Sequence, residues 1–115
     1  MSREIKFRSW DGSKIIYGVD VSNNGKALVS DYEWDYPLMQ YTGLKDKNGK
    51  DIYEGDIVKQ EKWVSVGKYS PCKAIIKYSG VGFTCDCIGK WEGSNADLNG
   101  NAEIIGNIYE NPELL

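Results

Sequence analysis

Short runs of alternating apolar and polar residues, each ended by turn-forming residues, constrain this chain more than any other feature. Residues 14–21 carry apolar side chains at the odd positions, which is the period of two that a half-buried strand requires. The runs end at groups of Gly, Asn, Asp and Ser, and Asn48-Gly49 is the strongest short hairpin signal available. The pattern therefore predicts a mainly β protein of hairpins with at most short helical turns.

The length of the chain indicates one structural unit. At 115 residues it is long enough to enclose one hydrophobic core and too short to divide comfortably into two. A hydrophobic content of 41% and an aromatic content of 12% are those of a folded protein. We therefore treat residues 1–115 as a single domain.

The first hairpin is expected between residues 3–10 and residues 14–21, with residues 11–13 as its loop. A loop of odd length is needed to bring the odd-numbered apolar side chains of both strands onto one face. The register that follows pairs Phe7 with Tyr17 and Ile5 with Val19.

Further strands are expected wherever apolar residues recur at every second position. The clearest pair is residues 72–78 and 81–88, joined at Ser79-Gly80. Residues 89–102, rich in Gly, Asn and Ser, form either a loop or one short helix at residues 95–98. Other expectations are strands at 26–32, 38–42, 57–60 prolonged to 66 and 103–109, an exposed loop at 45–50, one helical turn at 52–56, and a loop at 67–71.

The three cysteines are the first candidates for chemistry. On the expected hairpin Cys72, Cys85 and Cys87 share one face, and Cys72 lies opposite Cys87 if the loop has two residues; a four-residue loop preserves the shared face. Zinc is disfavoured because structural zinc sites usually have four Cys or His ligands, and this chain contains no His. We therefore interpret the cysteines as core side chains with free thiols, and expect no metal and no cofactor.

Absence of His also leaves carboxylates as the only ordinary acid–base groups. Glu54 and Asp56 flank Gly55 and could form a carboxylate pair or a metal site. The alternative is structural, with Gly55 at a positive φ and Asp56 accepting hydrogen bonds from nearby backbone N–H groups to lock the turn before Ile57. We favour Gly55 and Asp56 as a structural turn, and predict that the chain is not an enzyme.

Acidic and aromatic residues alternate from residue 31 to residue 36. In an extended segment Tyr32, Trp34 and Tyr36 share one face, and the acids share the other. These rings either pack in the core or form an interaction surface for a protein partner or a second copy of the chain. Base stacking is less favoured because stacking surfaces usually carry positive charge, whereas this segment is acidic.

The overall charge limits the partners. Fourteen Lys and Arg against seventeen Asp and Glu leave a net charge of -3, so the molecule as a whole repels a phosphate backbone. Nucleic acid needs a local argument, which Arg3, Lys6 and Arg8 of the first strand suggest. No apolar stretch approaches the ~20 residues that span a bilayer, and residues 1–4 lack the apolar core of a signal peptide. We expect no membrane partner and a cytoplasmic location.

Three blocks of this sequence are long and have an unusual order of residues. They comprise residues 3–8 with Trp10-Asp11, residues 39–50 continuing through 52–58, and residues 105–115. In these blocks the chain resembles the YopX protein family, and because they lie at both ends and in the middle, the resemblance covers the whole domain. Residues 12–36 and 60–101 depart freely from the pattern.

The resemblance implies a phage or prophage protein of Gram-positive bacteria with a small SH3-like or partly open barrel that self-associates. It implies no reaction and transfers no catalytic residue, because the family is one of unknown function. Together with the residues above, it favours a non-enzymatic protein-interaction module; the alternative is a nucleic-acid-binding small β-barrel. Self-association is expected through exposed strand edges, at the first hairpin or at residues 32–36.

Overall fold

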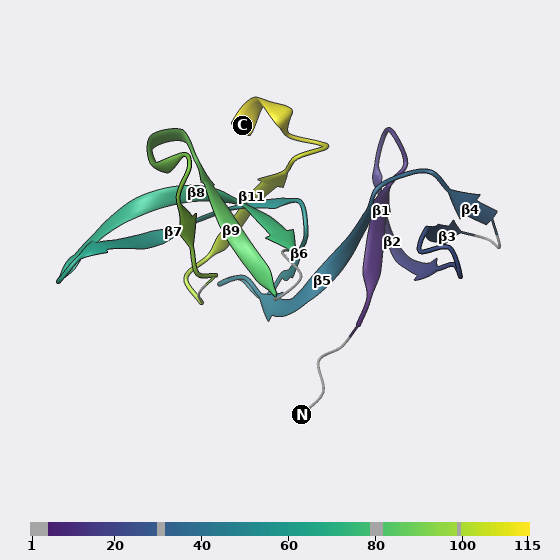
Figure 1. Ribbon diagram of the computed structural model, residues 1–115, viewed down its shortest axis with the longest axis horizontal. Coiled ribbons are helices and arrows are strands. Elements are labelled where there is room, and N and C mark those ends of the chain that lie inside the picture. The colour runs from purple at the N-terminus through teal and green to yellow at the C-terminus, as the bar shows by residue number, and fades with distance from the viewer. Residues whose placement is uncertain (1–4, 30–31, 79–81, 99) are drawn as a thin grey trace.

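The computed structural model describes residues 5–29, 32–78, 82–98 and 100–115 (Figure 1). The chain is mainly β, as the sequence predicts, and forms two antiparallel sheets without a closed barrel in the part described. Within those ranges its helical content is limited to two 3-10 turns, η1 (Gly89–Trp91) and η2 (Pro112–Leu114). The expected turn at Ser79-Gly80, together with Arg3 and Val81, lies outside the described residues.

The first sheet has six strands in the order β4-β3-β2-β1-β5-β6. Strand β1 lies between β2 and β5, and β2 pairs with β3 at Asp20 and Val21, so self-association at the first hairpin stays a prediction. The expected strand at 26–32 is instead two short strands that pair with each other. The bounds are β1 (Phe7–Trp10), β2 (Ile15–Val21), β3 (Ala27–Val29), β4 (Tyr32–Trp34), β5 (Leu38–Lys45) and β6 (Asp51–Tyr53).

The register of the first hairpin also differs from the expectation. Trp10 pairs with Ile15, so the connection is residues 11–14 rather than 11–13. Asp11 causes this turn, because its Oδ1 accepts hydrogen bonds from the backbone N–H groups of Ser13 and Lys14. A bulge between Phe7 and Arg8 then shifts the register by one residue. The resulting pairs are Arg8 with Tyr17 and Phe7 with Val19.

The second sheet has five strands in the order β10-β9-β8-β7-β11. Strand β8 begins well before residue 72, so the loop expected at 67–71 is wrong; Gly67, at a φ of +71°, supplies the turn instead. The helix expected at 95–98 is also wrong, because Asn95 and Ala96 pair with β9. The bounds are β7 (Asp56–Ser65), β8 (Lys68–Tyr78), β9 (Phe83–Ile88), β10 (Asn95–Ala96) and β11 (Glu103–Asn107).

The hydrophobic core lies on the inner face of this second sheet. Val58 pairs with Ala74, and Ile76 pairs with Cys85, so alternate residues of β7, β8 and β9 meet inside. The predicted shared face of the three cysteines is confirmed, since all three are buried. The core consists of Ile52, Val58, Cys72, Ala74, Ile76, Cys85, Cys87 and Ala102.

The second sheet curls until β10 approaches β7, which makes a partly open barrel. Side chains rather than a backbone ladder bridge the gap: Gln60 Nε2 donates to the Asp97 carbonyl at 2.7 Å, and Lys62 Nζ donates to the Asn95 carbonyl at 2.9 Å. Beyond this point β7 and β8 continue together as a projecting hairpin (Figure 1). The molecule is accordingly elongated, with a radius of gyration of 15.0 Å, against about 13 Å for a compact domain of similar size.

Candidate functional site

The turn between β6 and β7 is built around Gly55, at the junction of the two sheets. Gly55 has a φ of +85°, its N–H donates to the Ile76 carbonyl, and its carbonyl accepts from Ile108 N–H, both at 2.9 Å. The Asp56 carboxylate accepts from Tyr53 N–H at 2.8 Å. This is the geometry expected of a structural turn, although the helical turn expected at 52–56 is wrong, because β6 and β7 run directly into the turn.

Asp56 also forms an ion pair with Arg8 of the first sheet. Arg8 Nη2 lies 2.9 Å from Asp56 Oδ1, and both side chains are only 3% exposed. The same Nη2 donates to the Glu54 carbonyl at 3.2 Å, and the guanidinium lies over the Tyr53 ring, 4.7 Å from its centroid. Burial raises the pKa of Asp56, while the Arg8 charge acts to lower it. The pair is a structural link between the sheets.

Glu54 and Asp56 do not act as a carboxylate pair in this arrangement. Glu54 Oε1 accepts from Gln40 N–H at 2.9 Å, so its side chain supports β5, whereas Asp56 is engaged by Arg8 and Tyr53. No group of three or more His, Cys, Asp or Glu positioned to hold a metal occurs within the described ranges.

The three cysteines are free and buried. Ala74, not Cys72, pairs with Cys87, because Tyr78 pairs with Phe83 and leaves residues 79–82 as the connection. The Cys72 and Cys87 Sγ atoms are nevertheless 3.2 Å apart as diagonal neighbours. Burial raises the pKa of Cys72 and of Cys85 to about 12. At neutral pH these two thiols are protonated and are poor nucleophiles and poor metal ligands.

The predicted interaction surface lies on β4, at one edge of the first sheet. Tyr32 is 75% exposed and Tyr36 is 46% exposed, so two of the three rings face solvent. Trp34 is half-buried and packs edge-on against Tyr36, with ring centroids 5.2 Å apart. The three rings are thus divided between surface and interior. The sequence alone leaves both interpretations open.

The cations of the first strand do not form a basic surface. Lys6 Nζ lies 2.6 Å from Asp51 Oδ2, and Arg8 is buried against Asp56. Arg3 lies outside the described residues. Arg8 is therefore not available to a nucleic acid, whereas Lys6 shares the Asp51 carboxylate with Lys45.

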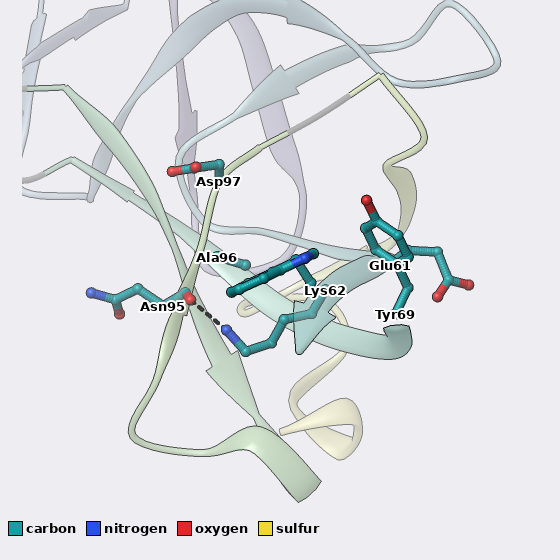
Figure 2. A pocket seen from close by; sticks show the side chains of 7 residues that line it. Glu61, Lys62, Tyr69, Asn95, Ala96 and Asp97 are labelled. Atoms are coloured by element: carbon teal, nitrogen blue, oxygen red, sulfur yellow. Dashed lines mark hydrogen bonds between the residues drawn. The ribbon is translucent and has the colours of Figure 1, made fainter. Parts of the chain in front are cut away.

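Sequence reasoning missed the projecting end of the β7–β8 hairpin as a surface. Trp63 pairs with Tyr69 there, and the two are 58% and 64% exposed. A pocket of about 400 Å³ opens where this hairpin meets β10 (Figure 2). The signal for this hairpin is Gly67, which allows a turn between the strand expected to residue 66 and the residues that follow, for which the sequence predicts a loop. The lining residues are Glu61, Lys62, Trp63, Tyr69, Asn95, Ala96 and Asp97.

With this geometry established, comparison with known proteins identifies the family. The family model described as YopX protein matches residues 11–115, which is nearly the whole chain. The chain belongs to the YopX family. No curated protein matches this YopX-family chain in sequence.

A solved structure shares the fold of this YopX-family chain. It is described as the crystal structure of protein EF1440 from Enterococcus faecalis, and it superposes with a TM-score of 0.68 at 27% identity over 99% of both chains. None of the helices in the described part of our chain is long and apolar enough to span a membrane.

The three sequence blocks of the resemblance meet where the two sheets join, and the family model, which begins at residue 11, covers only Asp11 of the first block. Arg8 comes from the first block, Asp56 from the middle block and Tyr109 from the last, and Tyr109 stacks on Trp10 with ring centroids 5.8 Å apart. A polar cavity of about 300 Å³ lies beside the ion pair. Its lining includes Arg8, Asp56 and Asn107, together with five neighbouring residues of β11 and the chain end. These blocks therefore have a structural explanation in holding the sheets together.

Proposed function

We propose that this YopX-family chain is a non-enzymatic protein-interaction module of phage or prophage origin that acts in the bacterial cytoplasm. Its contact surface in this proposal is the edge of β4 with the Tyr32 and Tyr36 rings. The observation that supports it most directly is that β4 ends the six-stranded sheet with Tyr32 exposed on it and Tyr36 exposed two residues beyond it.

An edge strand favours one kind of contact. Its outer N–H and C=O groups lack strand partners, so an extended segment of another protein can add to the sheet through backbone hydrogen bonds. Exposed Tyr32 and Tyr36 then supply the large, rigid contact area on which interface affinity commonly depends. The β4 edge thus offers both backbone pairing and side-chain contacts.

The acids beside the rings are held in place by local contacts. Glu33 accepts hydrogen bonds from the Ser22 hydroxyl at 2.8 Å and from the Asn24 amide at 3.1 Å. Asp35 lies 2.8 Å from Lys26 Nζ. These contacts tie β4 to the β2–β3 turn, so the edge is organised before a partner arrives.

A second copy of the chain is the partner that can be tested with the purified chain alone. Sedimentation velocity at high micromolar concentration should show an oligomer for the wild type. The double variant Tyr32→Ala/Tyr36→Ala should dissociate it without loss of β-structure by circular dichroism. The matched control is Tyr78→Ala, which removes a tyrosine of comparable exposure, 51%, from the second sheet.

Trp34→Ala tests whether the Trp34 ring acts in the interaction surface or in packing of the interior. If Trp34 acts mainly in packing Tyr36, the variant lowers the unfolding midpoint, whereas loss of the oligomer with unchanged stability places the ring in the interface. Two results together would contradict the proposal. The wild type would be monomeric at high micromolar concentration, and no partner protein would be captured in a way that depends on Tyr32 and Tyr36.

A further inference from the structure

Two lysines face each other across the outer surface of the second sheet. Lys59 on β7 pairs directly with Lys73 on β8, and both side chains are exposed. Among residues placed by the structure, neither ammonium group forms an ion pair. Like charges at directly opposed positions destabilise a sheet by roughly several tenths of a kcal/mol. An anion bound over this pair would relieve the repulsion.

The cavity on one side of the pair is also positive. A cavity of about 230 Å³ is lined by Lys59, Lys73 and Lys90 and by no acidic residue. Glu103, which pairs with Lys59 from β11, is shared with Lys47, its Oε1 lying 3.7 Å from Lys47 Nζ. The cavity is thus a small basic depression on an acidic protein.

Aromatic rings lie on the same face, further along the hairpin. Trp63 pairs with Tyr69, and positions 59, 61 and 63 of β7 point to one side of the sheet. Figure 2 shows Glu61 and Tyr69 close to each other, while Lys62 reaches the Asn95 carbonyl. Four residues of strand place the rings ~13 Å from the lysines.

We propose that this face, defined by Lys59, Lys73, Trp63 and Tyr69, binds single-stranded nucleic acid. Phosphates lie on the two ammonium groups, and unpaired bases stack on the exposed rings of Trp63 and Tyr69. An acidic peptide would use the charges but would not supply flat, regularly spaced rings to the aromatic pair.

The net charge of -3 does not oppose binding at this face. The cavity beside the pair is lined by three lysines and no acid, and Glu61, between the lysines and the rings, is the exposed acid of β7 on this face. Local charge rather than the total governs contacts at this range, because exposed charges are screened beyond about 8 Å at physiological salt. The proposal goes beyond protein binding at β4 and uses a different surface.

The test is fluorescence anisotropy with a labelled oligothymidylate and with a duplex of equal length. The full chain should bind the single strand more tightly than the duplex, and affinity should fall steeply between about 50 and 200 mM salt. Trp63→Ala should weaken binding roughly tenfold, as expected for loss of one stacked base.

Charge reversal at Lys59 gives the variant that tests the proposal most directly. Lys59→Glu replaces the like-charge pair with Lys73 by an opposite-charge pair but places the new carboxylate opposite Glu103, so its stability should stay close to that of wild type while its affinity falls roughly tenfold or more. The matched control is Lys14→Glu, which makes the same change of net charge at an exposed lysine on the other sheet. Its affinity should change far less.

Three outcomes would overturn the proposal. They are absence of binding at low salt, an equal loss of affinity in Lys14→Glu and Lys59→Glu, and binding of polyglutamate at least as tight as that of the oligothymidylate. The last outcome would assign the face to an acidic protein. Thermal unfolding of every variant distinguishes lost binding from lost folding.

Discussion

Arg8 and Asp56 join the two sheets of this YopX-family protein through a buried ion pair, with Arg8 Nη2 2.9 Å from Asp56 Oδ1. Residue 8 belongs to β1 and residue 56 to β7, so the pair connects segments far apart in the sequence. Removal of one member leaves the other buried without its counter-charge, which is far more costly than loss of an exposed pair.

Arg8→Met should therefore lower the free energy of unfolding by about 3–5 kcal/mol, measured by urea denaturation at neutral pH. Lys26→Met is the matched control, because it breaks the exposed pair with Asp35 and should leave stability unchanged within error. An Arg8→Met variant as stable as wild type would show that the ion pair does not hold the sheets together.

Gly55→Ala should destabilise the protein more than Gly18→Ala. Both glycines have a positive φ, which costs an alanine about 1–2 kcal/mol. At Gly55 an added Cβ would also lie 3.0 Å from the Met39 sulfur, whereas at Gly18 nothing lies within 4 Å. The crowding should add roughly 1–3 kcal/mol in urea denaturation. Equal effects of the two substitutions would mean that Met39 moves aside freely.

Acid should destabilise the fold through Asp46 and Asp51. Burial acts to raise the pKa of Asp46, but N–H donors of Lys50, Ile104 and Asn48 outweigh it and lower the pKa below its ordinary value. Hydrogen bonds from Lys45 and Lys6 lower the pKa of Asp51. The stabilisation is therefore present above the unfolded-state pKa, about 3.9, and is lost as pH falls through the lower folded-state pKa values.

The unfolding midpoint should accordingly fall as the pH drops below about 4. Asp46→Asn should have a lower midpoint at pH 7 and a shallower decline in acid, because Asn does not titrate. A decline as steep as that of wild type would assign the acid sensitivity to other carboxylates.

The thiols should be reduced, unreactive and free of metal in the native protein. Burial raises the pKa of Cys72 and of Cys85 to about 12, so thiolate is scarce at pH 8. Labelling with a chromogenic disulfide should be slow in buffer and should find all three thiols in denaturant. Stoichiometric zinc by elemental analysis, or fewer free thiols in denaturant, would contradict this interpretation.

Local patterns predicted much of this fold because they depend on few residues. The inward face of Ala74 and Ile76 follows from alternation alone, and Asn48-Gly49 marks a turn, with Gly49 at a φ of +85°. The exposed loop expected at 45–50 holds except for Asp46, which is 5% exposed. Its side chain turns inward to accept Ile104 N–H from β11, a partner that no neighbouring residue reveals.

Errors arose where distant segments decide between similar local conformations. Residues 95–98 have the composition of a loop or short helix, but the free edge of β9 recruits Asn95 and Ala96 as a strand. Residues 68–71 of the expected loop likewise become part of β8 because β7 continues far enough to pair with them. In both cases the backbone hydrogen bonds of a neighbouring strand outweigh weak local preference.

The sequence by itself determined the fold class, the shared face of the cysteines and the turn chemistry at Gly55 and Asp56, because side-chain alternation and turn geometry act over a few bonds. Only the tertiary structure decided which charges are available. Lys6 and Arg8 look free in the sequence but meet Asp51 and Asp56 from the middle of the chain, while Lys59 and Lys73 meet each other. Charge pairing depends on proximity in space, and the register of distant strands sets that proximity.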